Sequence, residues 1–489
     1  MIKPNWTGIA KVESFITAAL GLAMLPPLFI CIFENESQAL LESFAFLAAL
    51  CFVGCYLLNE AGSKMKKPID TRDGMLVVFI GWVSACIIGA IPYYVAGVLT
   101  TPMNAFFESV SGFSTTAVSL IDVLENVPKA LLMWRSETQW LGGVGVIVVI
   151  LAVIPTYGRS SDSMLTIESP GGRSIKVFAK SATSAKTIIS VYAVLTLVQA
   201  VLLVFGGLSI FDALTLAFSS ISSAGFTNYS DGIMHFGSAY VEIILMIFMF
   251  LSCVSFVLYG NVLRREWGSI KKNSELKTYI AIIIATSVLV CVSLALNHTF
   301  ASAGDIFRYG IFESIAFATT TGHAATDLRL WPSFAKGILT IVSFIGGCSV
   351  STGCGIKVFR TIVVFKIIKK SFVQRLHPNA VVSIKVDGEA LSTNTLNSAV
   401  AYIMTFTALL FAGTLIIALE CPDMSASLAT SGALLSNTGT SFSSIAYGGG
   451  YNVFSDPVKF VMCVLMLAGR LEIYSLFVIF TRDFWNLDN

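Results

Sequence analysis

The sequence predicts an all-α polytopic membrane protein: four pseudo-repeats of helix, pore loop and helix around one pore, behind two extra N-terminal transmembrane helices. The first supporting observation is composition, because 55% of the 489 residues are hydrophobic, 12% are charged, and the mean hydropathy is +0.80. Soluble globular chains carry about 25% charged residues, so this chain has the composition of a membrane interior. The other two observations are long apolar stretches and a short segment that recurs between them.

Apolar stretches near or above the ~20 residues that cross a bilayer predict ten transmembrane helices. They cover about 14–33, 40–58, 76–97, 137–156, 187–207, 239–261, 278–298, 335–356, 397–419 and 457–481. The N-terminus lacks the basic region and cleavage site of a secretory signal, so the first stretch is expected to be a permanent helix.

Four shorter segments lie between the third and fourth, fifth and sixth, seventh and eighth, and ninth and tenth stretches. They cover about 103–116, 211–224, 308–321 and 425–438, and are too short and too rich in Ser and Thr to span. Each ends in small and hydroxyl residues, namely Ser114–Ala117, Ser222–Gly225, Thr319–Gly322 and Ser436–Gly439. The spacing of roughly 100 residues indicates a repeat. We therefore expect re-entrant pore loops whose carbonyl groups surround a monovalent cation. Four unrelated external loops are the alternative.

Matching residues within the segments support the repeat. Asn104, Asp212 and Ser425 stand at one offset in the first, second and fourth segments, and these residue types cap helices. The third segment lacks such a cap but shares a Phe-Glu-Ser sequence, at 312–314, with the first, at 107–109. Each segment is expected to begin as a half-helix whose negative C-terminal end points at the cation.

Lysine and arginine predict the orientation. They concentrate after the second, fourth, sixth and eighth apolar stretches, at Lys64, Lys66, Lys67, Arg72, Arg159, Arg173, Lys176, Lys180, Lys186, Arg264, Arg265, Lys271, Lys272, Lys277, Lys357, Arg360, Lys366, Lys369, Lys370, Arg375 and Lys385. By the positive-inside rule, these loops and both termini are cytoplasmic, and the pore loops enter from outside. The outer acids would concentrate cations, unless they are ordinary solvated charges: Glu34, Glu36, Asp122, Glu125, Asp231, Glu420, Asp423 and Asp456.

Small residues between Gly346 and Lys357 interrupt the eighth apolar stretch. Glycine costs about 1 kcal/mol per helical position against alanine, so a broken helix is predicted, forming a flexible constriction beneath the third pore loop. A nucleotide-binding P-loop is excluded, because Lys357 is followed by Val358 rather than Ser or Thr. Close helix contact through small residues is the alternative, and it is the preferred interpretation of the glycine-rich run Leu141–Gly145.

Arg470 lies inside the last apolar stretch. A charge there costs at least ~2.5 kcal/mol, so it should face protein or water. Near the pore axis it would add a positive barrier to cation passage. The alternatives are snorkelling toward the cytoplasm or an ion pair with an acid such as Glu472, which faces elsewhere on an ideal helix.

No pattern indicates catalysis or a structural metal. The four histidines are well separated, with His323 directly after Gly322, and the ten cysteines form no CxxC pair or cluster at metal-ligand spacing. Without a hydrolytic or redox constellation, the chain is expected not to be an enzyme.

Several segments together resemble a known family. They are Trp-Arg-Ser at 134–136 with Gln139–Gly143, the loop Gly346–Lys357, Arg-Leu-His-Pro at 375–378, and Gly-Arg-Leu-Glu at 469–472. Over about residues 14–485 the chain resembles the membrane subunit of the Trk potassium-uptake system, in the Trk/Ktr/HKT superfamily. The resemblance implies a bacterial cytoplasmic (inner) membrane location and a homodimer with one pore per protomer. It also implies docking on a cytoplasmic ring of nucleotide-binding, TrkA-like regulatory subunits. Potassium, some sodium and the lipid bilayer complete the expected partners, with no nucleic acid.

The resemblance also implies the site residues. Carried over by position, the potassium-binding filter is Thr115, Thr116, Ala117, Ser223, Ala224, Gly225, Thr320, Thr321, Gly322, Asn437, Thr438 and Gly439. Gating is assigned to Gly346, Gly347, Ser351, Thr352, Gly353, Gly355, Lys357 and Arg470. Potassium at the filter is the only metal expected. No covalent cofactor is expected, and nucleotide is expected only on the regulatory partner.

Three positions depart from the family pattern, which usually has glycine there. At Ala117 a Cβ is disfavoured at positive φ and narrows the pore, and in the plant branch loss of this glycine accompanies sodium permeation. Val350 and Cys354 predict a bulkier, less flexible gate.

We expect an N-terminal helix pair at 1–70 and pore repeats at 71–160, 161–275, 276–385 and 386–489. The expected function is potassium uptake, gated by the intramembrane loop and Arg470. The alternatives are a sodium-permeable or sodium-preferring channel or symporter on the same scaffold, a multi-span enzyme acting on lipid, and a structural assembly subunit. Passive or proton- or sodium-coupled flux, and the identity of the regulatory nucleotide, stay open at this point.

Overall fold

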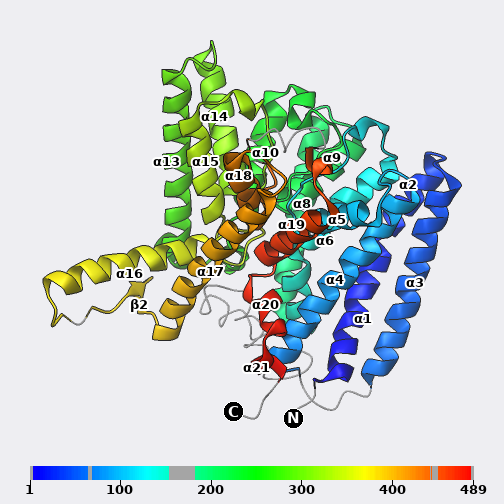
Figure 1. Cartoon of the computed structure of the whole chain (residues 1–489), viewed down its shortest axis with the longest axis horizontal. Helices are drawn as coiled ribbons and strands as arrows, with labels where there is room; N and C mark the ends of the chain where they lie inside the picture. The colour runs from blue at the N-terminus through cyan, green and yellow to red at the C-terminus, as the bar shows by residue number, and fades with distance from the viewer. Residues whose placement is uncertain are drawn as a thin grey trace.

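The computed structural model describes residues 4–63, 69–153, 182–380, 382–440, 442 and 450–485. This part is helical apart from one antiparallel hairpin of β1 (Lys385–Val386) and β2 (Glu389–Ala390). Six helical segments are long and apolar enough to cross a membrane, or seven if one bent pair counts as a span. The chain is therefore an all-α multi-pass membrane protein, as predicted (Figure 1).

The predicted N-terminal pair precedes the repeats. Its first member consists of α1 (Trp6–Ala23) and α2 (Leu25–Phe33), which meet at Met24, and its second is α3 (Gln38–Ser63). The first helix begins at Trp6, earlier than the apolar stretch alone indicates. α3 runs back beside α1, and the pair covers one side of the bundle (Figure 1).

The same order of elements then recurs four times. A long helix comes first: α4 (Thr71–Val95), α8 (Ala182–Phe205), α13 (Ser274–Leu296) and α17 (Thr393–Ile417). A short pore helix follows: α5 (Pro102–Phe113), α9 (Ile210–Ile221), α14 (Ala303–Ala318) and α18 (Met424–Leu435). After the pore loop comes a 3₁₀ turn: η1 (Leu124–Asn126), η3 (Gly232–Phe236), η4 (Leu328–Leu330) and η6 (Gly450–Val453). A second helix ends the repeat: α6 (Lys129–Val153), α10 (Ala239–Ser252), α15 (Ser333–Ile345) and α19 (Asp456–Arg470). The four predicted re-entrant segments are thus helices too short to span, each inserted between the first and second helices of its repeat.

The pore helices are capped by other residues than predicted. In all four, an N-cap oxygen accepts a backbone N–H of the first turn, from Thr101, Ser209, Ser302 and Asp423. The prediction that Asn104, Asp212 and Ser425 cap their helices is therefore wrong. The prediction that the third pore helix lacks a cap is wrong as well, because Ser302 caps it. The upstream hydroxyl or carboxylate already satisfies the free N–H groups. Asn104 Oδ1 instead accepts a 2.8 Å hydrogen bond from Lys459 Nζ.

Three of the second helices are broken. This corrects the continuous spans predicted at 239–261 and 457–481, and it agrees with the break predicted within 335–356. α10 ends at Ser252 and the chain turns by 89° into α11 (Phe256–Leu263). After α15, residues 346–357 form a loop before α16 (Val358–Leu376). After α19, Glu472 and Ile473 have φ of 60° and 46°, a left-handed conformation that ends the helix before α20 (Tyr474–Phe477). In the first repeat, α6 runs unbroken to Val153.

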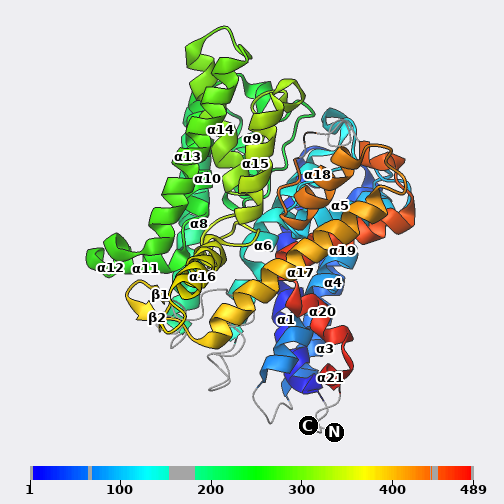
Figure 2. The same cartoon turned by 60° about the vertical axis from the view of Figure 1, so that its left-hand side comes forward.

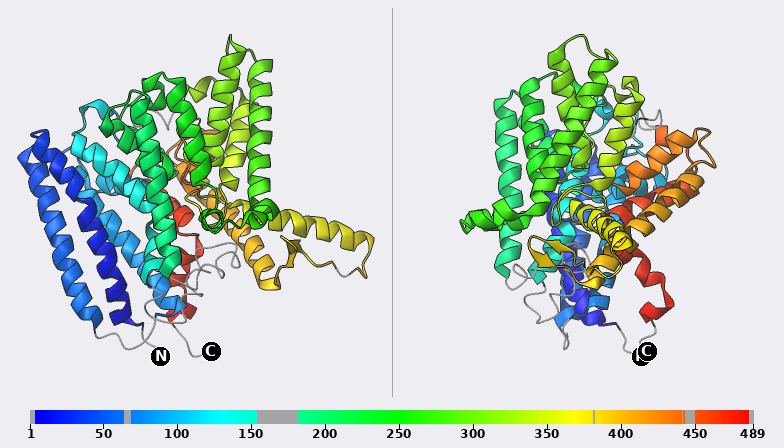
Figure 3. Two further views of the ribbon diagram at one scale, coloured as in Figure 1. Left: turned by 180° about the vertical axis from the view of Figure 1, so that it is seen from behind. Right: turned by 90° about the vertical axis from the view of Figure 1, so that its left-hand side faces the viewer.

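The bundle places α1, α3 and α4 on one side and α13, α14 and α15 on the other (Figures 1 and 3). α16 projects from the bundle (Figure 1), and the β1–β2 hairpin lies beside it (Figure 2). The start of α1 and the short helix α21 (Arg482–Trp485) lie at one end of the molecule. Of the basic residues used to predict orientation, those at 64–67 and 159–180 lie outside the described residues.

Candidate pore, filter and gate

The four predicted filter loops share one backbone conformation. The first filter residue of each has a left-handed φ, of 59° at Thr115, 57° at Ser223, 57° at Thr320 and 55° at Asn437. The third has a positive φ as well, of 61° at Ala117, 110° at Gly225, 67° at Gly322 and 71° at Gly439. The N–H of the middle residue donates to a pore-helix carbonyl at 2.9–3.0 Å, at Thr116, Ala224, Thr321 and Thr438. Because these N–H groups point back to the pore helix, they do not compete with a cation for the filter carbonyl oxygens. Two of these oxygens accept hydrogen bonds from Thr440: Thr438 O from its backbone N–H at 2.8 Å, and Gly322 O from its hydroxyl group.

The loops pack against one another in chain order and close a ring. In three loops, a Cβ on the third filter residue would overlap a carbonyl oxygen of the next loop: Gly225 with Thr321, Gly322 with Thr438, and Gly439 with Thr116. At the remaining seam, the Cβ of Ala117 lies 3.6 Å from the position that a Cβ on Gly225 would take. At three of the four seams the loop backbones therefore touch without an intervening side chain, so the size of the ring depends on the residue at the third filter position.

Hydroxyl pairs brace three of the loops. The residue before the filter lies 2.7–2.9 Å from the middle filter residue, oxygen to oxygen, in Ser114–Thr116, Thr319–Thr321 and Ser436–Thr438. The second loop has Ala224 in the middle and lacks this pair. Asn437 Nδ2 joins the fourth loop to the first through a 2.8 Å hydrogen bond to Thr116 Oγ1. The filter is thus pseudo-symmetric, with the second loop as the exception.

A cavity of about 220 Å³ opens beyond the filter. The third filter residue of every loop lines it: Ala117, Gly225, Gly322 and Gly439. His323 also lines it and is buried, and its ring nitrogens have no hydrogen-bond partner among the described residues. Four loops from four repeats therefore face one common vestibule.

Of the predicted outer acids, Asp122 and Asp231 line this vestibule. Others are bound within the outer loops. Glu34 Oε1 accepts from Lys129 Nζ at 2.7 Å, and Glu125 accepts from Ser230 N and Oγ at 2.8 and 2.6 Å. The Ser230 hydrogen bonds hold the pKa of the Glu125 carboxyl below its usual range. The interpretation of the acids as ordinary loop charges thus fits Glu34 and Glu125, whereas Asp122 and Asp231 line the vestibule, where a carboxylate can attract cations.

The intramembrane loop, residues 346–357, lies against the opposite side of the filter. Thr352 Oγ1 is 2.7 Å from Ser223 Oγ, and Cys354 N donates to Thr320 Oγ1 at 2.9 Å. Cys354 Sγ is 3.9 Å from Thr115 Oγ1. The loop therefore contacts the third pore loop, beneath which it was predicted, and also the first filter residue of the first and second repeats.

Neighbouring backbone holds the loop in place. Cys348 N donates to Cys253 O at 3.0 Å, and Phe256 N donates to Val350 O at 2.9 Å, at the break between α10 and α11. Val350 has a φ of 56°, which is an outlier for a β-branched residue. A Cβ on Gly353 would lie 2.7 Å from Cys253 Sγ. The small residues thus also permit close contact, as the alternative interpretation expected.

Arg470 joins three elements. Its guanidinium donates to Gly142 O and Gly143 O of α6, and to Thr352 O (2.9 Å) and Cys354 Sγ (3.2 Å) of the intramembrane loop. These partners lie 116 to 328 positions away in sequence. The charge at the end of α19 therefore faces protein beside the loop, as its cost in lipid requires.

Glu472 pairs with Arg360 and not with Arg470, the partner considered from the sequence. It forms a buried ion pair with Arg360 Nη2 of α16, and the Arg360 guanidinium lies 3.6 Å from the centre of the Tyr402 ring. The Arg470–Glu472 pair is therefore wrong. Sequence analysis missed Arg360–Glu472, although two opposite charges beside apolar stretches were the available signal.

A second buried ion pair supports the outer side of the filter. Arg135 Nε of α6 lies 3.1 Å from Glu108 Oε1 of α5, and Arg135 Nη1 donates to Thr227 O at 3.2 Å. The guanidinium also stacks 3.9 Å from the centre of the Phe226 ring. Both charges lie within segments singled out by the sequence, but their pairing was not predicted. The contact ties the first pore helix to the chain after the second filter loop.

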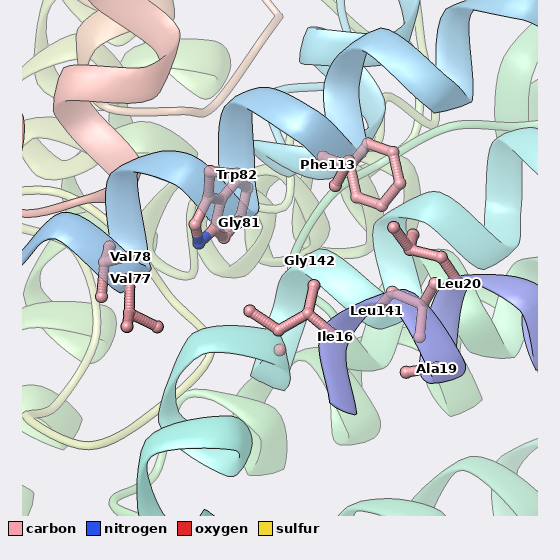
Figure 4. Close-up of a pocket in the computed structure, with 12 residues that line it drawn as sticks. Ile16, Ala19, Leu20, Val77, Val78, Gly81, Trp82, Phe113, Leu141 and Gly142 are labelled. Atoms are coloured by element: carbon pink, nitrogen blue, oxygen red, sulfur yellow. The ribbon is translucent and has the colours of Figure 1, made fainter. Parts of the chain in front are cut away.

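An apolar pocket of about 90 Å³ lies apart from this pathway, between α1, α4, α6 and the end of α5 (Figure 4). Ile16, Trp82, Phe113 and Gly142 belong to its wall, and the described residues that line it are apolar or glycine. A Cβ on Gly142 would overlap Phe113 O, so the glycine run in α6 packs closely on the pore helix, as predicted. The pocket can hold an apolar group but offers no ligands to a cation.

Comparison with known families places this architecture. The family model TrkH, described as a cation transport protein, matches residues 38–486. The chain belongs to this family. It is 30% identical to the Trk system potassium uptake protein TrkH of Vibrio parahaemolyticus, over 98% of this chain and 99% of that protein. It is 30% identical to the Trk system potassium uptake protein TrkG of Escherichia coli, over 96% and 97% of the two chains.

The fold comparison agrees with the family assignment. The crystal structure of the potassium transporter TrkH from Vibrio parahaemolyticus matches with a TM-score of 0.86 and 27% identity, over 98% of this chain and 99% of that one. The resemblance to the Trk family and the predicted all-α polytopic fold are therefore confirmed.

Proposed function

We propose that this chain moves potassium into the cell across the bacterial cytoplasmic membrane, with some sodium passing. The observation that carries the proposal is the closed ring of four loops with matched left-handed residues, facing one vestibule. A ring of backbone carbonyls can replace the hydration shell of a monovalent cation. The relatives named as potassium uptake proteins support potassium as that cation.

The filter residues of this proposal are the twelve assigned from the sequence, three in each loop: 115–117, 223–225, 320–322 and 437–439. Each loop directly follows the C-terminal end of a pore helix. Helix C-termini carry about half a negative charge, so four of them favour a cation at the filter.

The intramembrane loop and Arg470 form the proposed gate, with the loop glycines, Ser351, Thr352 and Lys357 as its moving parts. In the conformation seen here, the loop contacts three filter loops and is bound by Arg470, so we assign it to the closed state. Lys357 Nζ donates to Gly353 O, which adds a charge inside the loop. Opening requires the loop to leave the filter and Arg470 to release Thr352.

The proposal includes the homodimer, the cytoplasmic ring of nucleotide-binding regulatory subunits, and cytoplasmic termini. Two features support a cytoplasmic partner. α16 projects from the bundle, and Lys366, Lys369, Lys370 and Arg375 lie on it (Figure 3). A projecting basic helix can contact a partner without disturbing the spanning helices.

A sodium-permeable or sodium-preferring transporter is the second candidate, and Ala117 is the observation that favours it. The other loops have glycine at this position, and Ala117 adopts the same left-handed φ despite its Cβ. The seam beside it therefore differs from the other three, which bears on the fit of the ring to potassium.

Cation flux into liposomes holding the purified chain tests the proposal. We expect potassium and rubidium uptake to exceed sodium uptake. Sodium flux equal to or above potassium flux would favour the second candidate. Absence of any flux, both alone and with the regulatory ring, would contradict transport.

Val350→Gly tests the gate. A left-handed residue with a side chain costs about 1–2 kcal/mol, so glycine should stabilise the observed closed conformation and lower open probability by about fivefold to thirtyfold. Val350→Ala is the matched control, because it removes bulk but keeps the left-handed strain. Single-channel recordings with unchanged open probability and conductance in Val350→Gly would contradict the assignment of this loop as the gate.

A further inference from the structure

The first two residues of α13 bind two different parts of the chain. Glu275 is 8% exposed, and its Oε1 accepts a 2.6 Å hydrogen bond from the backbone N–H of Ser349 in the intramembrane loop. Ser274 N, one residue earlier, donates to Asp387 Oδ1 of the β1–β2 hairpin at 2.8 Å. The start of α13 thus lies between the loop and an exposed hairpin.

The carboxyl group of Glu275, at the start of α13, is buried against the intramembrane loop. A carboxyl group buried at this depth is costly unless it is hydrogen-bonded. The hydrogen bond from Ser349 N offsets part of this cost, so holding a loop N–H is the role that the geometry of Glu275 supports.

The hairpin is a compact unit. Asp387 and Gly388 have φ of 54° and 85°, so both central residues are left-handed, as a two-residue hairpin turn requires. Val386 is buried in the same hydrophobic cluster as Tyr279 of α13 and Cys348 of the loop. The hairpin is therefore packed against α13 and the intramembrane loop through the buried side chain of Val386.

The hairpin is also bound to α16. Lys366 Nζ donates to Lys385 O of β1. Since α16 begins directly after the loop, a shift of the hairpin acts on the loop from both sides, through α13 and through α16.

We infer that Glu275 is a positioning residue that holds the intramembrane loop against the filter, and that the Asp387 hairpin is the lever through which the cytoplasmic side releases it. This inference rests on the proposed gate. Moving the hairpin displaces Ser274, Glu275 follows because it is the next residue, and Ser349 loses its acceptor. Without this hydrogen bond the closed position of the loop is less stable, and the loop leaves the filter more often.

The test measures rubidium flux into liposomes without any cytoplasmic partner. Glu275→Ala removes the acceptor and should raise basal flux about tenfold, the effect of losing one hydrogen bond to a buried carboxyl group. Glu275→Gln keeps an oxygen at the same place and should return flux close to wild type. Glu13→Ala, which removes another buried carboxyl group on α1 far from the loop in sequence, is the matched control and should leave flux unchanged.

A second pair of variants keeps the inference testable if Glu275→Ala fails to fold. Asp387 is exposed, and Asp387→Gly keeps the left-handed turn while removing the acceptor. We expect a rise of roughly twofold to threefold, since the hairpin acts through Glu275. Asp387→Asn keeps both turn and acceptor and should match wild type. In the double variant with Glu275→Ala, flux should not exceed that of Glu275→Ala alone.

The outcomes separate this inference from the gate itself. If Val350→Gly alters open probability but Glu275→Ala and Asp387→Gly do not raise flux, the lever is wrong and the gate stands. Flux in Glu275→Gln as high as in Glu275→Ala would also overturn it, because the oxygen acceptor would then be irrelevant. If Val350→Gly, Glu275→Ala and Asp387→Gly all leave open probability and flux unchanged, the assignment of the loop as the gate is itself contradicted.

Discussion

Replacement of Ala117 by glycine tests the filter geometry most directly. Ala117 has a φ of 61°, where the equivalent residues of the other loops are glycine. A non-glycine residue in this region costs about 1–2 kcal/mol. Glycine loses more conformational freedom on folding, by about 0.5–1 kcal/mol. The variant should therefore be more stable than wild type by between about 0 and 1.5 kcal/mol.

The larger consequence concerns the seam between the first and second loops. At the other seams, a carbonyl oxygen of the next loop occupies the place of a Cβ. At the first seam the Cβ of Ala117 takes up this place, so we expect the Ala224 carbonyl to lie farther from the first loop. Gly225 has a φ of 110°, against 67° at Gly322 and 71° at Gly439, as expected for a displaced loop. Removing the Cβ lets the second loop close on the first. A gain of about 1 kcal/mol in potassium over sodium binding corresponds to roughly fivefold in selectivity.

The assay is the ratio of potassium to sodium flux in liposomes, measured beside thermal unfolding. Ala117→Ser is the matched control, because it keeps the Cβ and should gain neither selectivity nor stability. An Ala117→Gly protein with the selectivity of wild type and no gain in stability would refute the reasoning. It would mean that the seam beside Ala117 does not determine which cation fits.

Three further predictions follow from single contacts. Gly439→Ala places a Cβ against Thr116 O, so rubidium uptake should fall by about tenfold or more, and a rate near wild type would contradict the closed ring. Arg470→Lys keeps the positive charge but loses the fork that reaches α6 and the loop together. Basal flux should therefore rise roughly tenfold, whereas wild-type flux would mean that the charge alone matters. Glu125 has a lowered pKa through Ser230, so its contribution to stability is fully present above the ordinary carboxyl pKa and is lost as outer pH falls through the lowered value. The difference in melting temperature between wild type and Glu125→Gln should be constant near neutral pH and shrink in acid, and a difference independent of pH would contradict it.

Much of the fold could be predicted because the signals are local. The four pore segments were found by length and by their Ser- and Thr-rich tails, and the loop at 346–357 by its density of small residues. The breaks in α10 and α19 were missed. Each lies within an apolar stretch of spanning length, and hydropathy does not distinguish a straight helix from a bent one.

The capping error has a similar cause. Asn104 and its counterparts are good caps by residue type, but Thr101 and Ser209 are as good and stand earlier. Which of two candidates caps a helix depends on where the chain enters it, and that is determined by packing against the preceding helix.

The sequence by itself determined the membrane class, the recurrence of four short segments and the interruption of the eighth apolar stretch, because composition and spacing encode them. The filter residues were assigned by resemblance to the Trk family, and that assignment stays a prediction. The tertiary structure alone decided which buried charges meet. Arg470 binds Gly142 rather than Glu472, Glu472 binds Arg360, and Glu275 binds Ser349. These partners are at least 74 positions apart, and in a low-dielectric interior a charge must find hydrogen-bond partners wherever the fold brings them. Periodicity along a chain carries no information about such pairs.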